Sequence, residues 1–233
     1  MNSSVQNNIN DILTGIKDIC IKQGRDYNDV TLVAVSKTVE VEKIKEVADA
    51  GIENVGENKV QEILEKYDEL KDVLNIHMIG HLQRNKVKYI IDKVALIHSV
   101  DSIRLLKEIN RRAAQLELIV DVLIQVNVAD EETKYGIKID EVNSFLKNSA
   151  GFDNVSIKGL MTIAPFTDNK EDVRQVFRAL KKKFDEISAL SYCNVEMKYL
   201  SMGMTGDYPI ALEEGANMLR IGTKIFGSRT YNK

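Results

Sequence analysis

Val33-Ala34-Val35-Ser36-Lys37 is an apolar run that ends in a lysine. It forms most of the first strand expected along the chain, residues 31–36. A strand this apolar is buried on both faces, which is typical of a parallel sheet covered by helices. Such α/β folds keep their functional groups where the strands end. The run therefore predicts a parallel α/β fold and puts Lys37 at the mouth of a crevice.

Strand-like and helix-like segments alternate on both sides of this run. Strands are expected at residues 31–36, 54–56, 76–80, 95–99, 120–128, 157–163, 199–202 and 218–221. Helices are expected at about 5–23 and at 41–50, 59–67, 83–91, 102–116, 141–149 and 171–190. Eight strands, each followed by a helical segment, predict a single (β/α)8 barrel (TIM barrel) with an extra N-terminal helix. An open, doubly wound sheet is the alternative.

The composition fits one compact domain spanning residues 1–233. Hydrophobic residues make up 44% and charged residues 29%, and no linker or low-complexity tract divides the chain. A net charge of −3 offers no broad basic field, so nucleic-acid binding is not expected. Residues 1–10 lack the apolar core of a signal peptide, and no run is long enough to span a membrane. We therefore expect a soluble, cytoplasmic protein.

No metal site is expected. Cys20 and Cys193 lie far apart, which suits a reducing cytosol better than a metal cluster. His77 and His81 are four residues apart but fall in a strand-like segment without a carboxylate at ligand spacing. We interpret His77 as a core or edge histidine, whereas His81, at the strand end, could reach a bound ligand.

Lys37 has two interpretations that its position alone leaves open. A partly desolvated lysine can lose its proton and form a Schiff base with an aldehyde. Alternatively, a lysine at a strand end simply reaches into water.

Two loops near the C-terminus favour the first interpretation. Residues 201–206 (SMGMTG) follow the seventh strand, and residues 220–223 (RIGT) end the eighth. Glycines let backbone amides approach an anion closely, and Ser201 and Thr223 add hydroxyl donors. Barrels place phosphate sites in the loops after these two strands, although turn formation and helix capping would use the same residues.

A phosphate site and a reactive lysine at one barrel mouth together indicate pyridoxal 5′-phosphate. Its phosphate would lie on Ser201, Gly203, Gly222 and Thr223, and Lys37 would bond its aldehyde. Arg220, always charged, would keep the pyridine nitrogen unprotonated, which weakens the cofactor as an electron sink. Arg220 could instead be a structural ion-pair residue.

The chain also resembles the pyridoxal phosphate homeostasis protein family over nearly its whole length. The resemblance is carried, in order, by residues 34–38 (AVSKT), 55–58 (VGEN), 77–83 (HMIGHLQ), 98–101 (HSVD), 125–127 (QVN), 159–161 (GLM), 200–204 (LSMGM) and 220–227 (RIGTKIFG). It implies a barrel like the N-terminal domain of alanine racemase, with the cofactor on Lys37. It further implies phosphate contacts from Ser201, Gly222 and Thr223 and a pyridine-nitrogen contact from Arg220.

The resemblance also places three further residues on segments that face the cofactor, namely Asn58, His81 and Met161. Small departures occur: Ile76 stands where the family often has tryptophan, and Thr205 where serine is frequent. Neither departure touches Lys37 or Arg220.

Two functions remain open from the sequence. The first is a non-catalytic carrier or buffer that holds pyridoxal phosphate and passes it to apo-enzymes. The second is an amino-acid racemase, which needs acid–base groups on both faces of the substrate carbon. In alanine racemases a tyrosine from a second domain supplies one of them, and this chain is one barrel long. We therefore expect a carrier, and a monomer.

Overall fold

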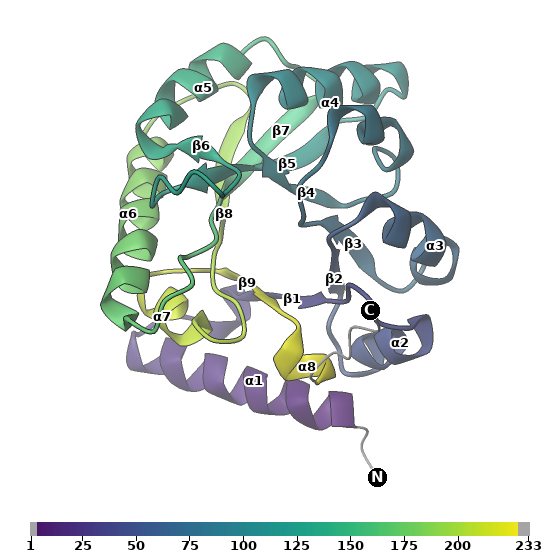
Figure 1. The fold of residues 1–233 in the computed structure, drawn as a ribbon, viewed down its shortest axis with the longest axis vertical. Coiled ribbons are helices and arrows are strands. Elements are labelled where there is room, and N and C mark those ends of the chain that lie inside the picture. The colour runs from purple at the N-terminus through teal and green to yellow at the C-terminus, as the bar shows by residue number, and fades with distance from the viewer. Residues whose placement is uncertain (1–3, 228–233) are drawn as a thin grey trace.

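The core of the molecule is a closed ring of eight parallel strands. The computed structural model describes residues 4–227. The strands are β1 (Thr31–Val35), β2 (Asn54–Glu57), β3 (Asn75–Met78), β4 (Leu96–Val100), β5 (Val120–Asn127), β7 (Val155–Met161), β8 (Val195–Ser201) and β9 (Met218–Ile221). They pair in the order β4-β3-β2-β1-β9-β8-β7-β5, and a β4–β5 pairing closes the ring (Figure 1). The predicted (β/α)8 barrel is confirmed, and the open sheet is wrong.

Helices surround the ring and connect each strand to the next. They are α2 (Val41–Asp49), α3 (Val60–Leu70), α4 (Ile103–Gln115), α5 (Val142–Ser149), α6 (Lys170–Ser188), α7 (Tyr208–Glu213) and α8 (Thr223–Phe226). Three 3-10 turns, η1 (Tyr27–Asp29), η2 (Arg84–Tyr89) and η3 (Ile139–Glu141), and a short strand, β6 (Ile137–Lys138), complete the connections. None of the helices within residues 4–227 has the length and hydropathy that crossing a membrane requires.

Two connections differ from the sequence prediction. The segment expected as a helix at 83–91 is the 3-10 turn η2, in which only Val87 is buried. With one apolar anchor, it lacks the stripe that holds an α-helix against a barrel. The second difference is α7, which lies outside the helix ranges expected from the sequence. Pro209 lies in its first turn, where proline is compatible with a helix.

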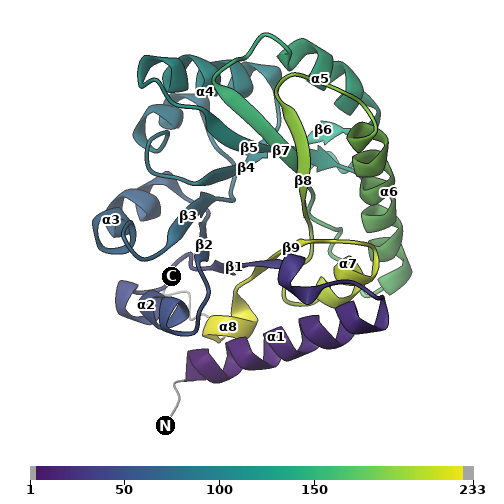
Figure 2. The ribbon, with the colours of Figure 1, turned by 180° about the vertical axis from the view of Figure 1, so that it is seen from behind.

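The N-terminal helix α1 (Ser4–Lys22) lies outside β1 and β9. Its buried residues recur at helical spacing and include Val5, Ile9 and Ile12. It packs against α2, α7 and α8 along one side of the barrel (Figures 1 and 2). The final helix α8 has only four residues, so α1 supplies the cover that the eighth helix of the ring would provide.

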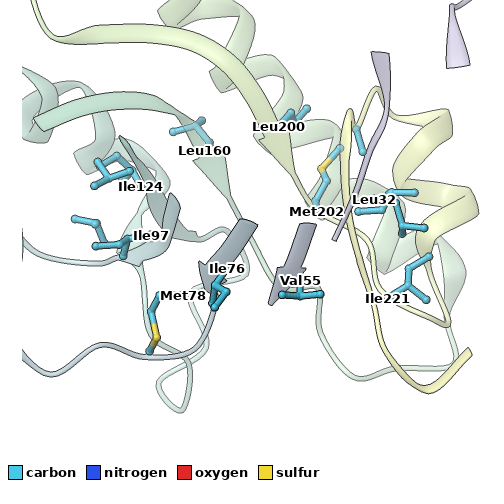
Figure 3. Packing of buried hydrophobic residues seen from close by; sticks show 14 of the residues in the cluster. Leu32, Val55, Ile76, Met78, Ile97, Ile124, Leu160, Leu200, Met202 and Ile221 are labelled. Atoms are coloured by element: carbon cyan, nitrogen blue, oxygen red, sulfur yellow. The ribbon is translucent and has the colours of Figure 1, made fainter. Parts of the chain in front are cut away.

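Most of β1 is buried on both faces because the strand separates two packed layers. Leu32 and Ala34 belong to the large cluster between the strands and the helices, whereas Val33 belongs to a smaller cluster inside the ring. Figure 3 shows helix-facing side chains from several strands, including Val55, Ile97 and Ile221. The interior cluster comprises Val33, Leu96, Leu123, Met161 and Met218. The barrel is therefore a filled core, and its chemistry is confined to the ends of the strands.

Candidate functional site

A cavity of about 740 Å³ lies at the carboxyl ends of β1, β7, β8 and β9. Four of the predicted site residues line it: Lys37, Arg220, Gly222 and Thr223. The loop after β8 contributes residues 204–207, and the loop after β7 contributes residues 163–168. The structure thus brings residues nearly 190 positions apart in the chain to one mouth, because all strands of the ring run in the same direction.

A second cavity, of about 790 Å³, lies at the opposite end of the barrel. It is lined by Thr14 and Lys17 of α1, by Tyr27, and by the starts of β1 and β2. The amino ends of barrel strands serve stability rather than chemistry. The cavity at the carboxyl ends is therefore the candidate site.

Lys37 is the second residue after β1 and is half-buried. Its neighbour Ser36 is fully buried, and Val35 lines the cavity beside it. Within residues 4–227, no hydrogen bond or ion pair engages the Lys37 amine. A lysine that faces a cavity without a carboxylate partner has a nitrogen free to react.

Arg220 also lines the cavity, and two hydrogen bonds hold its guanidinium group. Its side chain is 4% exposed; one terminal nitrogen donates to the hydroxyl of Ser201 and the other to the carbonyl of Thr162 at 2.8 Å. Burial lowers the pKa of Arg220 to about 10, and the charge of Asp207 acts in the opposite direction. The guanidinium therefore stays charged at neutral pH, oriented by neutral acceptors.

A buried histidine pair continues this network into the barrel interior. The Nδ1 atom of His98 lies 3.2 Å from the Ser201 hydroxyl, and its Nε2 atom lies 3.0 Å from Nδ1 of His77. Burial lowers the pKa of His77 to about 4 and that of His98 well below its usual range. Burial thus favours the uncharged form of both rings, and the 4% exposure of His77 confirms its interpretation as a core histidine. The described residues contain no cluster of side chains that could hold a metal.

The structure places Ser201 and Gly203 beside the cavity lining rather than in it. The Ser201 hydroxyl is engaged by Arg220 and His98. Gly203 has a φ of +93°, and a Cβ there would lie 2.6 Å from the Cβ of Ala211, so packing against α7 requires glycine. Their contacts with a phosphate stay predictions.

Thr205 and Gly206 of the same loop do line the cavity, together with Gly222 and Thr223. Sequence reasoning did not select Thr205 as a site residue. The signal was present, because Thr205 is a hydroxyl residue next to a glycine in the loop already singled out. Which hydroxyl faces the cavity depends on how the loop leaves β8, and the sequence pattern does not determine this.

Asn58, His81 and Met161 also lie outside the lining of this cavity. His81 is exposed; its Nδ1 atom lies 3.2 Å from a carboxylate oxygen of Asp101, and its ring stacks on Tyr135 with 3.8 Å between centroids. The backbone of Asn58 lies against Gly80, where a Cβ would come within 2.3 Å of the Asn58 oxygen. Met161 belongs to the interior cluster. A contact of these residues with a cofactor stays a prediction.

Known proteins resemble this chain in both sequence and structure. Residues 21–230 match the family model described as alanine racemase, N-terminal domain. The pyridoxal phosphate homeostasis protein of Aquifex aeolicus is 46% identical over 221 residues, which cover 94% of this chain and 96% of that protein.

Two solved structures have the same fold at clear sequence identity. An unknown protein from Bifidobacterium adolescentis has a TM-score of 0.92 and 32% identity, over 96% of this chain and 94% of its own. PipY of Synechococcus elongatus, in a structure with PLP bound, has a TM-score of 0.79 and 31% identity, over 91% of this chain and 100% of its own. The resemblance drawn from the sequence motifs is confirmed: the chain belongs to the pyridoxal phosphate homeostasis protein family, which has the barrel of the alanine racemase N-terminal domain.

Proposed function

We propose that this chain binds pyridoxal 5′-phosphate in the cavity at the carboxyl ends of the strands. It would hold the cofactor as a Schiff base on Lys37 and take part in intracellular pyridoxal phosphate homeostasis as a carrier or buffer. The observation that carries the proposal is the convergence on one cavity of Arg220, two glycine–hydroxyl loops and the Lys37 amine, which has no partner within residues 4–227. The homeostasis proteins among its relatives and the PLP-bound structure of PipY support it.

The donors around the cavity fit the cofactor. When bound, pyridoxal phosphate supplies an aldehyde carbon that an amine attacks, besides a phosphate and a pyridine nitrogen for anchoring. Lys37 would hold the aldehyde end, and Arg220 the ring nitrogen. Thr205, Gly222 and Thr223 would hold the phosphate through hydroxyl and amide donors. The volume of about 740 Å³ is within the range of small-molecule sites.

Three features of the cavity favour a carrier over a racemase. Arg220, which would face the ring nitrogen, donates hydrogen bonds and cannot supply the proton that strengthens an electron sink. Among the described residues that line the cavity there is no tyrosine, the residue that supplies the second acid–base group in alanine racemases. Lys134 lines it, but its amine is bound to Glu131 at 2.6 Å and to the carbonyl of Ala164 at 3.0 Å.

The remaining parts of the proposal concern the setting in the cell. We propose that apo-enzymes that use pyridoxal phosphate are the recipients, that the protein acts in the cytoplasm, and that it acts as a monomer formed by a single domain. Light scattering of the purified protein tests the monomer, and a mass of two chains would contradict it.

One paired assay tests the function. Protein loaded with pyridoxal phosphate is mixed with an apo-enzyme that needs this cofactor, and racemisation is measured across the amino acids in parallel. We expect the apo-enzyme to gain activity and no amino acid to be racemised. Lys37→Ala, loaded in the same way, is the control and should transfer little cofactor. Robust racemase turnover would overturn the carrier, and absence of bound cofactor would overturn the proposal as a whole.

A further inference from the structure

The residue before Lys37 is fixed through all three of its polar groups. The Ser36 amide donates to the carbonyl of Gly56 at 3.0 Å, and its hydroxyl donates to a carboxylate oxygen of Glu57 at 2.7 Å. Its carbonyl accepts from the amine of Lys66 at 3.0 Å. Because Ser36 is fully buried, these bonds are shielded from water.

The residue after Lys37 is held as well, in an unusual conformation. Thr38 has a φ of +60°, in the left-handed region that a branched residue seldom occupies. Its amide donates to a carboxylate oxygen of Glu62 at 2.6 Å, in a hydrogen bond strengthened by the charge of the acceptor. Such a conformation persists only where surrounding contacts enforce it. Glu62 supplies that contact.

Glu57, Lys66 and Glu62 form one connected group, here called the acidic clamp. The Lys66 amine lies 2.8 Å from Glu57 and 3.2 Å from Glu62, and the three side chains are 2–14% exposed. Glu57 ends β2, and the other two lie one turn apart on α3. The clamp therefore ties β2 and α3 to the two residues on either side of Lys37.

Burying the charged side chains of the clamp has a free-energy cost, which is typical of networks at functional sites. Burial raises the pKa of Glu57 to about 7, although Lys66 and Ser36 act in the opposite direction. Partial burial would also raise the pKa of Glu62, yet the bonds from Thr38 and Lys66 hold it below its usual value. One oxygen of Glu57 has no hydrogen-bond partner within residues 4–227. Apolar residues of similar size would join β2 and α3 without the cost of burying charged groups.

We propose that Glu57, Lys66 and Glu62 are positioning residues for Lys37, which fix its backbone so that the amine meets the aldehyde of pyridoxal phosphate in a reactive orientation. This inference rests on the proposed function. The lysine side chain is long and its amine has no partner among the described residues, so the clamp acts on the direction of its Cα–Cβ bond before the cofactor arrives. Fixing it reduces the orientational freedom that bond formation would otherwise remove.

The first test needs no cofactor. Hydrogen exchange of the Thr38 amide is followed by NMR in wild type, Glu62→Ala and Glu62→Gln. Loss of a charged acceptor should accelerate exchange in Glu62→Ala by about ten- to a hundredfold. Glu62→Gln keeps an oxygen acceptor and should restore most of the protection. Lys45→Ala is the matched control, because it breaks the exposed Lys45–Glu69 pair between α2 and α3 without touching the lysine loop.

The second test measures capture of the cofactor. The rate at which pyridoxal phosphate becomes trappable by borohydride should fall about tenfold in Glu62→Ala and remain near wild type in Glu62→Gln and Lys45→Ala. Glu57→Ala tests the other carboxylate of the clamp in the same way. If it fails to fold, the double variant Glu57→Gln and Lys66→Met replaces it, because this variant removes both charges of the buried Glu57–Lys66 pair together.

A folded Glu62→Ala protein with native Thr38 exchange and a native capture rate would overturn the inference, and so would faster exchange spread evenly over the barrel. Failure of the wild type to trap any cofactor would overturn the proposed function instead. The exchange of the Thr38 amide would still decide whether the clamp fixes the loop.

Discussion

Lys37 and Arg220 lie in one cavity, yet the molecule holds these two cations in opposite ways. The Lys37 amine has no partner within residues 4–227, and the residues on either side of it are held by charged side chains from outside the barrel. The Arg220 guanidinium is itself bound, by a hydroxyl and a carbonyl, in front of two neutral histidines in the interior. The lysine side fixes a backbone and leaves the side chain available, whereas the arginine side fixes the side chain.

The two arrangements suit two different chemical roles. An amine that must form a covalent bond has to reach its partner, so any clamp on it must act through the backbone. A guanidinium that only donates hydrogen bonds works best when its planar group is already oriented. The two regions also differ in charge, since the clamp has two carboxylates and a lysine, whereas the hydrogen-bond acceptors of Arg220 are neutral. The predictions below use that difference, from the largest expected effect to the smallest.

Breaking the clamp should have the largest effect on stability. Glu57→Ala leaves the Lys66 ammonium buried with one carboxylate fewer, and removing one partner of a buried pair costs about 3–5 kcal/mol. Denaturant unfolding measures this loss. Glu57→Gln retains a hydrogen-bond acceptor and should lose clearly less; equal losses in the two variants would show that the retained acceptor contributes nothing and would contradict this expectation.

Arg220→Ala should weaken pyridoxal phosphate binding by about a hundredfold, because hydrogen bonds from a charged donor contribute about 1.5–3 kcal/mol. It should also shift the absorbance of the bound cofactor, since the ring nitrogen loses its donor. Titration followed by absorbance measures both. Arg220→Lys keeps the charge without the fork of donors and should recover only part of the affinity. An unchanged affinity and spectrum would remove Arg220 from the site.

The two sides should respond to pH with opposite signs. The pKa of Glu57 is raised in the folded state to about 7 from 4.5, so its contribution to stability is present below pH 4.5 and is lost as the pH rises through 7. The pKa of His77 is lowered to about 4 from 6.5, so its contribution is present above pH 6.5 and is lost as the pH falls through 4.

Unfolding free energies between pH 4 and 8 test this for wild type, Glu57→Gln and His77→Gln. Relative to wild type, Glu57→Gln should gain stability toward pH 8, and His77→Gln should gain stability toward pH 4. Parallel curves for all three proteins would contradict the assignment of buried, shifted groups to both sides.

The smallest expected effect concerns the phosphate loops. Thr205→Val removes the hydroxyl at nearly constant volume and should weaken pyridoxal phosphate binding by about tenfold, whereas Thr205→Ser should bind normally. Binding of pyridoxal, which lacks the phosphate, should be the same in all three proteins. An equal loss for both ligands would place Thr205 away from the phosphate.

The barrel and several residues of the cavity could be predicted from the sequence, because they follow from the alternation of strands and helices. The alternation of segments predicts the barrel, and a barrel brings the ends of the first and last strands together, which unites Lys37 with Gly222 and Thr223. The apolar character of Val33 and Ala34 on opposite faces predicts burial on both sides of β1.

The rest depends on contacts that no local pattern contains. Whether Ser201 or Thr205 faces the cavity depends on the path of the chain between the end of β8 and the start of α7, which no local pattern determines. The clamp joins Ser36 to residues 21 and 30 positions away, and its members look like ordinary surface charges in the sequence. The pairing of β1 with β2 and the packing of α3 beside β2 bring them to the lysine loop.

The most direct test of the account is the site of covalent attachment. Wild-type protein is incubated with pyridoxal phosphate, reduced with borohydride, digested and mapped by mass spectrometry, with Lys37→Ala treated in parallel. The cavity offers two other amines, Lys134 and Lys170, under the same conditions. We predict one modified peptide, carrying the adduct on Lys37, and its loss in Lys37→Ala. An adduct on Lys134 or Lys170 in the wild type, or undiminished labelling in Lys37→Ala, would contradict the account.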